Sequence, residues 1–343
     1  MSQKLLSIVI VTNNRREDLK NLLDSITNQK NVNKDLFEII IVNNGEDIID
    51  LIKIYEKNLN IKYIKNDKNV GASKGRNIGF KNSCGDYILF LDDDNYLQNE
   101  DILKNIIEKD IKLLKENRDI GAIRYATEYP IYKNGKRIGY EYAVYELDSK
   151  TKKYYDLVNS IELLKLHSIY FYLNHFATCG VLIKRESFEK IKGFDENMFV
   201  YVEDIDLSIR LWINNYKVLL NPWIIIRHNE TPKMRNNLWK EYQMTKNQIL
   251  MLYKNFPIIL FLFYTINWLT IQSMISYRNL KQKELKISFL CMYFEFLKGL
   301  KDAIKLIFTH KIQRNPMSYK LWKFLRFDIP KENLKILKEK GLL

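Results

Sequence analysis

Cysteine is scarce in this chain of 343 residues, and its three copies, Cys84, Cys179 and Cys291, are widely spaced. An odd number of cysteines without metal-ligand spacing argues against a disulfide scaffold and favours a reducing compartment. The sequence also lacks internal repeats and low-complexity tracts. We expect no secretory signal, because the apolar run at 7–12 is short and continues directly into a polar, basic segment.

The basic residues are confined to one end of the chain. Residues 231–343 contain 21 lysines and arginines against 7 acidic residues, whereas residues 1–230 contain 34 of each, so the net charge of +14 belongs to the last third. The hydrophobic share of 46% is ordinary for a globular protein, and the length allows one large domain or two moderate ones. We therefore expect a domain boundary near residue 230 and a polyanionic partner for the basic part, either anionic lipid or nucleic acid.

The first 230 residues alternate apolar strands with helical stretches, which is typical of a parallel α/β sheet. Apolar runs predict strands at 6–11, 37–42, 61–64 and 87–91. Apolar residues at three- and four-residue spacing predict a helix at 17–29, and further helices are expected at 47–57 and 73–83. In sheets of this kind, ligands bind beyond the carboxyl ends of the strands, so polar residues at those ends mark the expected site.

Three adjacent carboxylates, Asp92, Asp93 and Asp94, follow the predicted strand at 87–91. Adjacent negative charges at the end of a buried strand repel one another and lose hydration. A divalent cation that carries a diphosphate reverses this cost, because hard cations prefer oxygen ligands. A solvated acidic turn is the alternative. Polar residues also follow the first two predicted strands, however, and three polar strand ends favour a binding site.

The middle of the chain is rich in tyrosine and contains Asn134 and Gly135, a pair typical of a two-residue hairpin turn. The tyrosines of 124–175 form either a binding wall or ordinary packing. A further strand is predicted at 179–184.

An amphipathic helix is predicted at 201–212. Its first turn holds Glu203, Asp204 and Asp206, in a position where acidic residues commonly complement the helix dipole. We expect Asp206 to be structural, because it is turned away from Asp204.

The last third of the chain reads as helical. Residues 255–277 carry no charge and are long enough to span a bilayer, but polar residues and Pro257 interrupt them, which favours a buried or membrane-surface helix. Residues 286–309 place charged and apolar side chains on opposite faces of a helix. Such a helix lies on a partner or in a membrane interface.

The chain resembles glycosyltransferase family 2 through an ordered series of motifs over about residues 5–230. The motifs are SIVIVTNNR, IIIVNNG, NVGASKGRNIGF, GDYILFLDDDN, CGVLIKRESFEKIKGFDE, YVEDIDLSIR and a trailing RH, and they look most like the rhamnosyltransferase-type members. Three aspartates alone are a weak signal, whereas this ordered set is specific. The resemblance implies a GT-A (Rossmann-like) fold, a mainly parallel α/β sheet flanked by helices and followed here by an α-helical C-terminal region. It also implies an inverting transfer from a nucleotide sugar to an acceptor hydroxyl with Mg²⁺ or Mn²⁺.

The resemblance also implies roles for the acidic residues and one histidine. Asp92 would contact the ribose of the donor and Asp94 the metal that bridges its two phosphates, with Asp93 assisting either one. A metal is physically suited to stabilising a departing nucleoside diphosphate. His228 follows the strand-like run at 221–227, where family histidines return to the metal. Without that resemblance, a lone histidine is more often a surface or core residue with its hydrogen bonds made within the protein than a metal ligand.

Asp204 stands where the family places its catalytic base. That group takes the acceptor proton while the hydroxyl attacks the anomeric carbon opposite the departing phosphate. Glu203 is expected to bind the acceptor sugar.

The donor pocket is expected to be assembled from the first three motifs. Its residues are Thr12, Asn14, Arg15, Asn43, Gly71, Lys74, Arg76 and Asn77. Glycine lets the backbone approach a ligand, and a guanidinium reaches the base or the diphosphate. Asn43 departs from the family, which usually has an acidic residue there that accepts the N3–H of uracil or thymine. Since an asparagine amide also donates, uridine and thymidine donors are favoured while cytidine and guanosine stay open.

The leading hypothesis is a cytoplasmic glycosyltransferase, peripheral on the inner face of the cell membrane. It would move a sugar to a surface glycan or a lipid-linked acceptor. We expect a catalytic domain at 1–230 and basic helices at 231–343. The helices would contact the anionic membrane or another copy of the chain in a homo-oligomer. We expect no nucleic-acid partner, because the aromatic residues of 256–309 lie on apolar helix faces and not among the basic residues.

Three alternatives remain at this point: a nucleotidyltransferase on a related α/β sheet, a basic nucleic-acid- or lipid-binding protein, and a sugar-nucleotide-binding scaffold without turnover. A nucleotidyltransferase would need a glycine-rich loop with a lysine directly after the first strand, which this sequence does not have, and it would give Glu203 and Asp204 no role. The intact acidic motifs argue against the last.

Overall fold

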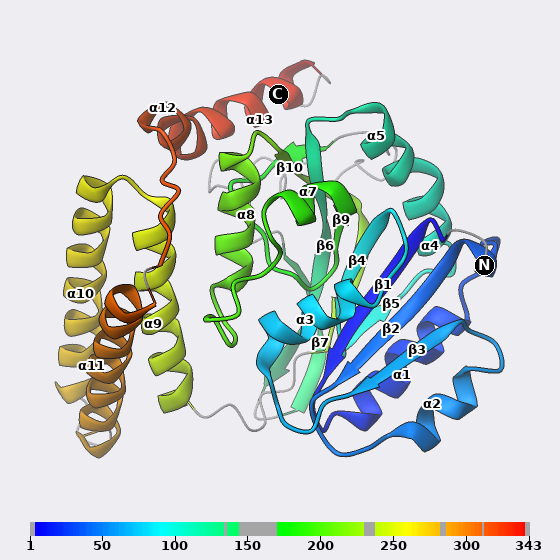
Figure 1. The fold of residues 1–343 in the computed structure, drawn as a ribbon, viewed down its shortest axis with the longest axis horizontal. Coiled ribbons are helices and arrows are strands. Elements are labelled where there is room, and N and C mark those ends of the chain that lie inside the picture. The colour runs from blue at the N-terminus through cyan, green and yellow to red at the C-terminus, as the bar shows by residue number, and fades with distance from the viewer. Residues whose placement is uncertain are drawn as a thin grey trace.

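The computed structural model describes residues 4–133, 136–143, 170–229, 237–281, 286–310 and 312–339 (Figure 1). Strands alternate with helices as far as β4, and from there to β10 neighbouring strands also follow one another directly. In this part the strands are β1 (Leu6–Thr12), β2 (Phe37–Asn43), β3 (Ile61–Lys65), β4 (Tyr87–Asp92), β5 (Asn95–Leu97), β6 (Ile120–Lys133), β7 (Lys136–Ala143), β8 (Phe171–Tyr172), β9 (Val181–Lys184) and β10 (Lys217–His228). The helices are α1 (Arg16–Thr27), η1 (Lys34–Leu36), α2 (Ile49–Tyr55), α3 (Gly71–Lys81), α4 (Ile102–Asn105), η2 (Ile106–Asp110), α5 (Ile111–Glu116), α7 (Arg185–Lys190) and α8 (Glu203–Ile213). From there on the chain is helical: α9 (Asn237–Asn255), α10 (Ile258–Lys281), α11 (Lys286–Thr309), α12 (Tyr319–Lys323), η4 (Phe324–Asp328) and α13 (Ile329–Glu339).

The strands form one twisted, mixed sheet with the order β3-β2-β1-β4-β9-β6-β10-β5, in which β7 pairs with β6 and β8 with β10. Strands β1 to β4 are mutually parallel, and β9 runs antiparallel between β4 and β6. Strand β10 is parallel to β6 and antiparallel to the short β5. The carboxyl ends of β1, β4 and β10 therefore meet at one edge of the sheet.

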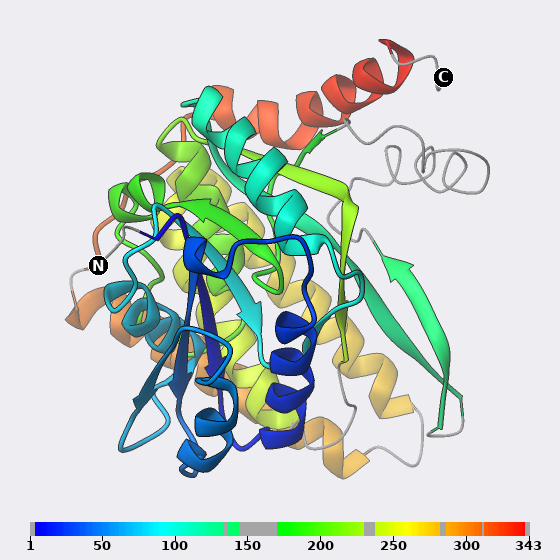
Figure 2. The same cartoon turned by 90° about the vertical axis from the view of Figure 1, so that its right-hand side faces the viewer.

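Side-chain alternation along the strands builds a core on each face of the sheet. In β1, Ile8 and Ile10 pack with the leucines of α1 and with side chains of α2, α4 and α5. Val9 faces the opposite way, into the core that α3, α7 and α8 cover. Figure 2 shows α1 on one side of the sheet.

Strands and helices of the first half lie close to the predicted ranges. Most of the helices begin or end about two residues from the predicted position, which is the usual uncertainty of a helix end. The predicted turn at 134–135 lies outside the described residues, although the flanking strands β6 and β7 pair antiparallel. The uncharged stretch at 255–277 divides around Pro257, so that α9 ends at Asn255 and α10 begins at Ile258.

The C-terminal helices pack directly against the sheet domain (Figure 1). Leu250 and Met251 of α9 belong to the same buried cluster as Leu207 of α8. A buried ion-pair network joins the same two helices: Asp206 lies 2.7 Å from Nε of Arg210 and 3.1 Å from Nζ of Lys254. Burial opposes ionisation of Asp206, but these two cations outweigh it and lower its pKa. Asp206 thus holds α8 to α9, in line with a structural role.

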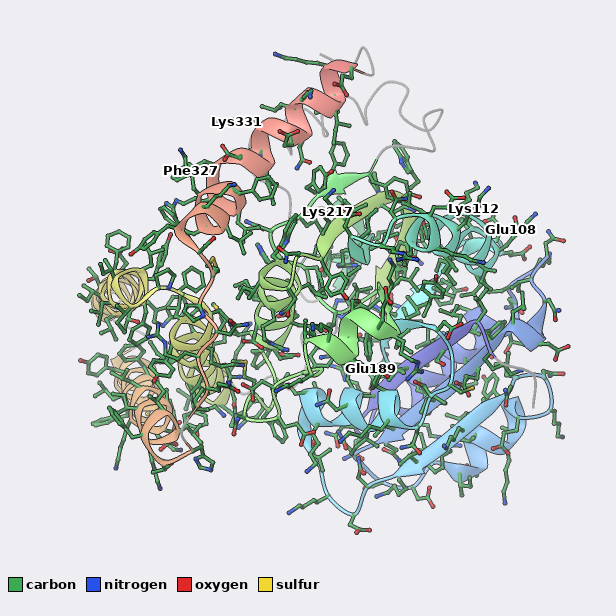
Figure 3. All side chains as sticks on the ribbon, turned by 45° about the horizontal axis from the view of Figure 1, so that its top comes forward. Glu108, Lys112, Glu189, Lys217, Phe327 and Lys331 are labelled. Atoms are coloured by element: carbon green, nitrogen blue, oxygen red, sulfur yellow. The ribbon has the colours of Figure 1, made fainter. Side chains whose placement is uncertain are left out.

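Helices α10 and α11 form the outermost layer and leave apolar side chains exposed (Figure 1). On α10 these are Ile258, Ile259, Leu262, Phe263 and Ile266, and on α11 Tyr293, Phe294, Leu297, Ile304 and Phe308. Phe327 and Lys331, in the segment from η4 to α13, also point outward (Figure 3). Within the described residues, none of the helices combines the length and the apolar character that a membrane crossing requires.

Candidate active site

A cavity of about 580 Å³ lies at the carboxyl ends of β1 and β4. Its walls come from these strand ends, from the start of α3, from the segment 177–179, from the start of α8 and from the end of β10. Asp92, Asp94 and His228 line it together with Glu203 and Asp204. The two acidic groups predicted from distant parts of the sequence therefore share one cleft.

Local hydrogen bonds fix the aspartate turn after β4. The side chain of Asn95 accepts a hydrogen bond from the backbone N–H of Asp92, and the N–H of Asn229 donates to the carbonyl of Asp94. The antiparallel pairing of β5 with β10 sets His228 opposite Asn95. This register carries a residue from far along the chain to the aspartates.

Asp92, Asp94 and His228 form a group whose ligand atoms all lie within 4.8 Å of one another. Nε2 of His228 is 2.9 Å from Oδ1 of Asp94 and 3.8 Å from Oδ2 of Asp92. Two carboxylates and an imidazole suit a divalent cation such as Mn²⁺ or Mg²⁺. Asp93 is not a member of this group; it lies 3.2 Å from Nη1 of Arg15.

The two neighbouring aspartates differ in their readiness to ionise. Burial would raise the pKa of Asp94, but His228 and Arg15 outweigh it and lower that pKa to about 2. Burial and the charge of Asp94 raise the pKa of Asp93 to about 7. The Asp94 carboxylate is therefore ionised at neutral pH, as a metal ligand must be.

Arg76 connects the aspartate turn to α8. Its guanidinium is buried and donates from Nη2 to Asp92 and from Nη1 to Glu203, each at 2.8 Å. One charged side chain from α3 thus spans the two acidic parts of the site. The predicted direct contact of Arg76 with the donor base or diphosphate remains a prediction.

Glu203 and Asp204 begin α8 after two residues with positive φ, Tyr201 at 69° and Val202 at 71°. A β-branched valine in this region is strained by about 1–3 kcal/mol, and such strain is commonly found at functional sites. The bend sets both carboxylates at the cavity wall.

Glu203 and Asp204 are both harder to ionise than exposed carboxylic acids. Burial and the charge of Asp204 raise the pKa of Glu203 to about 7, against the pull of Arg76. Burial also raises the pKa of Asp204, which is half-buried and accepts a hydrogen bond at Oδ1 from the N–H of Ile205 at 2.8 Å. Among the described residues, the buried Oε2 of Glu203 has no hydrogen-bond partner.

Some of the predicted donor residues line the cavity, namely Thr12, Arg15, Gly71 and Arg76. Gly71 has φ +85°, and a Cβ there would collide with Phe199, so only glycine fits this turn into α3. Arg15 lies 2.5 Å from Asp94 and brings positive charge to the cavity.

The other predicted donor residues make contacts within the protein. The Asn43 amide donates to the carbonyl of Glu46 and to the hydroxyl of Tyr63, while its Oδ1 accepts from the N–H of Gly45. Asn14 accepts from the N–H of Glu46 at 2.7 Å, and Lys74 is exposed beside Glu196 at 3.5 Å.

Asn77 is bonded to both the N–H and the carbonyl of Phe194. These bonds give Asn77 a part in shaping the loop that precedes α8.

Several residues at the cavity were not among the sequence predictions. Asn44, which neighbours Asn43, lines the cavity, and its amide lies 3.3 Å from the carbonyl of Gly71. Trp239 of α9 also lines it, in edge contact with Phe199 and Tyr201. Asn44 could have been predicted, because it belongs to the polar pair that follows β2. Trp239 could not, because it lies outside the part of the chain that contains the motifs.

The strand order, with an acidic turn and a shared cleft at one edge of the sheet, matches the GT-A fold expected of a glycosyltransferase. The family model described as glycosyl transferase family 2 matches residues 7–192, more than half of the chain. The chain therefore belongs to glycosyltransferase family 2.

Relatives and solved structures agree with this assignment. An uncharacterised glycosyltransferase of Methanocaldococcus jannaschii is 31% identical over 222 residues, which are 63% of this chain and 68% of that protein. The poly-beta-1,6-N-acetyl-D-glucosamine synthase of Staphylococcus epidermidis is 24% identical over 69% of this chain and 52% of its own.

Among solved structures, S. aureus TarS (residues 1–349) in complex with UDP-GlcNAc aligns with TM-score 0.55 at 16% identity over 98% of this chain and 92% of that chain. The mannosyltransferase PcManGT of Pyrobaculum calidifontis, with GDP-Man and Mn²⁺, aligns with TM-score 0.52 at 13% identity over 100% and 88%. At these identities the two structures support the fold alone.

Proposed function

We propose that the protein transfers a sugar, with inversion, from a nucleotide-diphosphate sugar to a hydroxyl of a surface glycan or a lipid-linked acceptor. The observation that carries the proposal is the shared cavity. On one wall lie Asp92, Asp94 and His228, and on another lies Asp204. An inverting transfer needs a group on the leaving-group side and a base on the acceptor side of one sugar.

Asp204 is the proposed general base. Burial raises its pKa above the ordinary 3.8, which makes its carboxylate a better proton acceptor than an exposed aspartate. The hydrogen bond from Ile205 to Oδ1 holds the orientation of the carboxylate at the cavity wall. Beside it, the Oε2 atom of Glu203 is suited to accept a hydrogen bond from another hydroxyl of the acceptor sugar.

Asp92, Asp94 and His228 are the proposed holders of Mg²⁺ or Mn²⁺. A cation there supplies Lewis-acid stabilisation of the diphosphate leaving group. Arg15 pairs with Asp94 and adds a second positive charge near the leaving oxygens. The solved structure of PcManGT also contains Mn²⁺, an ion of the proposed class.

Recognition of the donor base is assigned to the strand ends β1 and β2. Uridine and thymidine donors remain favoured. Asn44 lines the cavity, but like Asn43 it is bonded within the protein: its amide donates to the carbonyl of Gly71 and its Oδ1 accepts from the Asn66 amide. The neighbouring structures carry UDP, UDP-GlcNAc or GDP-Man, so they support nucleotide sugars as a class and leave the base open.

We further propose that the enzyme works at the cytoplasmic face of the cell membrane. The net charge of +14 in residues 231–343 complements anionic lipid, and the exposed apolar side chains of α10 and α11 suit the interface. The same face is available for contact between copies in a homo-oligomer.

A screen of nucleotide sugars tests the proposed function. Thermal unfolding and release of nucleoside diphosphate are measured with each sugar in the presence of Mn²⁺, and again after chelation. The proposal expects one donor to raise the melting temperature and to be slowly hydrolysed only with metal. Equal behaviour of all donors with and without metal would contradict it.

A further inference from the structure

A second cavity, of about 320 Å³, lies beside α8 and has no role in the proposed reaction. Its walls are mainly apolar and aromatic: Ile205 and Ile209 from α8, Met251 and Leu252 from α9, Tyr264 from α10, and Trp322 from α12. The volume falls at the lower end of the range of about 300–1,000 Å³ typical of small-molecule sites, which are likewise mostly apolar. A narrow apolar ligand therefore suits it.

This cavity and the active site share two walls. On α8, Asp204 lines the active site and the next residue, Ile205, lines the second cavity. In the preceding segment, residues 174–175 line the second cavity and residues 177–179 the active site. Since a helix rises 1.5 Å per residue, Ile209 lies about 7.5 Å along the helix axis from Asp204. The start of α8 thus borders both cavities.

The few polar groups of the cavity favour an anion. Arg326 donates from Nη1 to the hydroxyl of Tyr264 at 2.6 Å, and His175 also lines the cavity. Among the described residues that line the cavity there is no aspartate or glutamate. A mostly apolar lining with one guanidinium and the neutral amides of Asn174 and Gln248 complements a hydrocarbon chain with a phosphate at one end.

We propose that this cavity binds the hydrocarbon chain of a lipid-linked acceptor whose chain is joined to the sugar through phosphate. The inference rests on the proposed function, because it places the sugar of that acceptor at Asp204. Helix α10 supports it from the outside. Tyr264 lines the cavity on the inner face of this helix, while Leu262, Phe263 and Ile266 are exposed on its other faces, so the helix proposed to face the membrane also forms one wall of the cavity.

Dodecyl phosphate, below its micelle-forming concentration, is the probe for this site. It is titrated by calorimetry into the full-length protein. Wild type is expected to bind it saturably, and inorganic phosphate at the same concentrations to bind without detectable heat. Gln248→Trp fills the cavity and should weaken binding at least about tenfold, whereas Gln248→Leu, of similar size, should retain it. Arg326 is exposed, so Arg326→Glu should leave folding intact and weaken binding about fivefold or more.

Unchanged affinity in both Gln248→Trp and Arg326→Glu would overturn the proposal. So would loss of binding in Leu262→Ser/Phe263→Ser with full binding in Gln248→Trp, since the chain would then lie on the outer surface of α10. Donor turnover is measured separately with Mn²⁺. Turnover without chain binding overturns only this inference. Chain binding without turnover of any nucleotide sugar overturns the proposed function and leaves the cavity as a lipid site.

Discussion

Arg76 is the side chain on which the geometry of the active site depends most. It is buried between Asp92 and Glu203, so it neutralises one carboxylate from each half of the site. Removing one partner of a buried ion pair leaves an uncompensated charge, which costs far more than the pair itself contributes. Arg76 therefore both stabilises the fold and sets the spacing between the donor and acceptor sides.

We expect Arg76→Gln to lower the free energy of unfolding by about 2–4 kcal/mol, because Asp92 and Glu203 lose their shared counter-charge. Urea denaturation measures the change. The matched control is Arg16→Gln, since Arg16 pairs with Asp50 in full exposure and should leave stability nearly unchanged. Equal free energies of unfolding for the two variants would show that the buried ion pairs of Arg76 stabilise the fold no more than the exposed pair of Arg16.

His228 is expected to contribute directly to metal affinity. In His228→Ala, the dissociation constant for Mn²⁺ in the presence of UDP should rise at least about tenfold, since even the outer partners of metal ligands are worth that much. Calorimetric titration gives the value. His310→Ala, an exposed histidine after α11, serves as the control and should bind Mn²⁺ as wild type does. Unaltered affinity in His228→Ala would remove this residue from the metal site.

Residues next to one another in a motif were easier to predict than partners that only the fold brings together. The aspartate turn and Glu203–Asp204 were found from their place at a strand end and a helix start. Arg76 and Glu203 are 127 residues apart in the chain, and their ion pair depends on how α3 packs beside α8. The local sequence pattern therefore does not predict it. Asn43 and Asn44 are the same residue type and both are bonded within the protein, so only the fold shows that Asn44 and not Asn43 lines the cavity.

At the scale of elements, the strands β1 to β4 were predictable because each is a short apolar run bounded by polar residues. Strand β5 is only three residues long, so neither hydrophobic periodicity nor composition predicts it. Its pairing with β10 nevertheless places His228 beside the aspartates. The π-helical turn η2 between α4 and α5 was equally hidden, since its identity depends on hydrogen bonding and not on residue type. It carries Asp110, a buried carboxylate on the face of the sheet away from α8.

Asp110 makes the stability of the fold depend on pH. Burial raises its pKa to about 6, although Tyr170 and Asn221 donate hydrogen bonds to Oδ1. The folded state therefore holds a proton that the unfolded state has lost between pH 3.8 and about 6, and stability falls as pH rises through that window.

Asp110→Asn keeps an acceptor for both hydrogen bonds and removes this titration. From about pH 5 to about pH 8, wild type should lose about 1 kcal/mol of stability relative to the variant. Denaturation at several pH values gives the difference, and parallel curves for the two proteins would contradict the role of Asp110.

At the scale of the whole molecule, the basic C-terminal third is not a detachable appendage. Leu250 and Met251 of α9 lie in the same core as α8, Lys254 reaches Asp206, and Trp239 lines the active site. Charge asymmetry was the basis for predicting a boundary near residue 230, but charge carries no information about which helices of this part face inward. Deleting residues 231–343 would expose the core, so membrane attachment is better tested by surface substitutions.

We expect Leu262→Ser/Phe263→Ser/Ile266→Ser to weaken binding to vesicles that contain anionic lipid, because these three side chains form an exposed apolar stripe on α10. Vesicle flotation measures the bound fraction. The control is Ile54→Ser on α2, an exposed apolar residue at the opposite end of the molecule, which should float as wild type does. If the triple variant floats unchanged, α10 is not the membrane-facing helix.

The most direct test of the whole account is the turnover of Asp204→Asn compared with its affinity for the donor. A general base contributes about 10²–10⁴-fold to a rate, so kcat for transfer should fall at least about 100-fold. The dissociation constant of the nucleotide sugar with Mn²⁺ should stay close to that of wild type, because Asp204 is not among the residues proposed to hold donor or metal. Full turnover in Asp204→Asn would contradict the assignment of the acceptor side of the cavity, and with it the proposed mechanism.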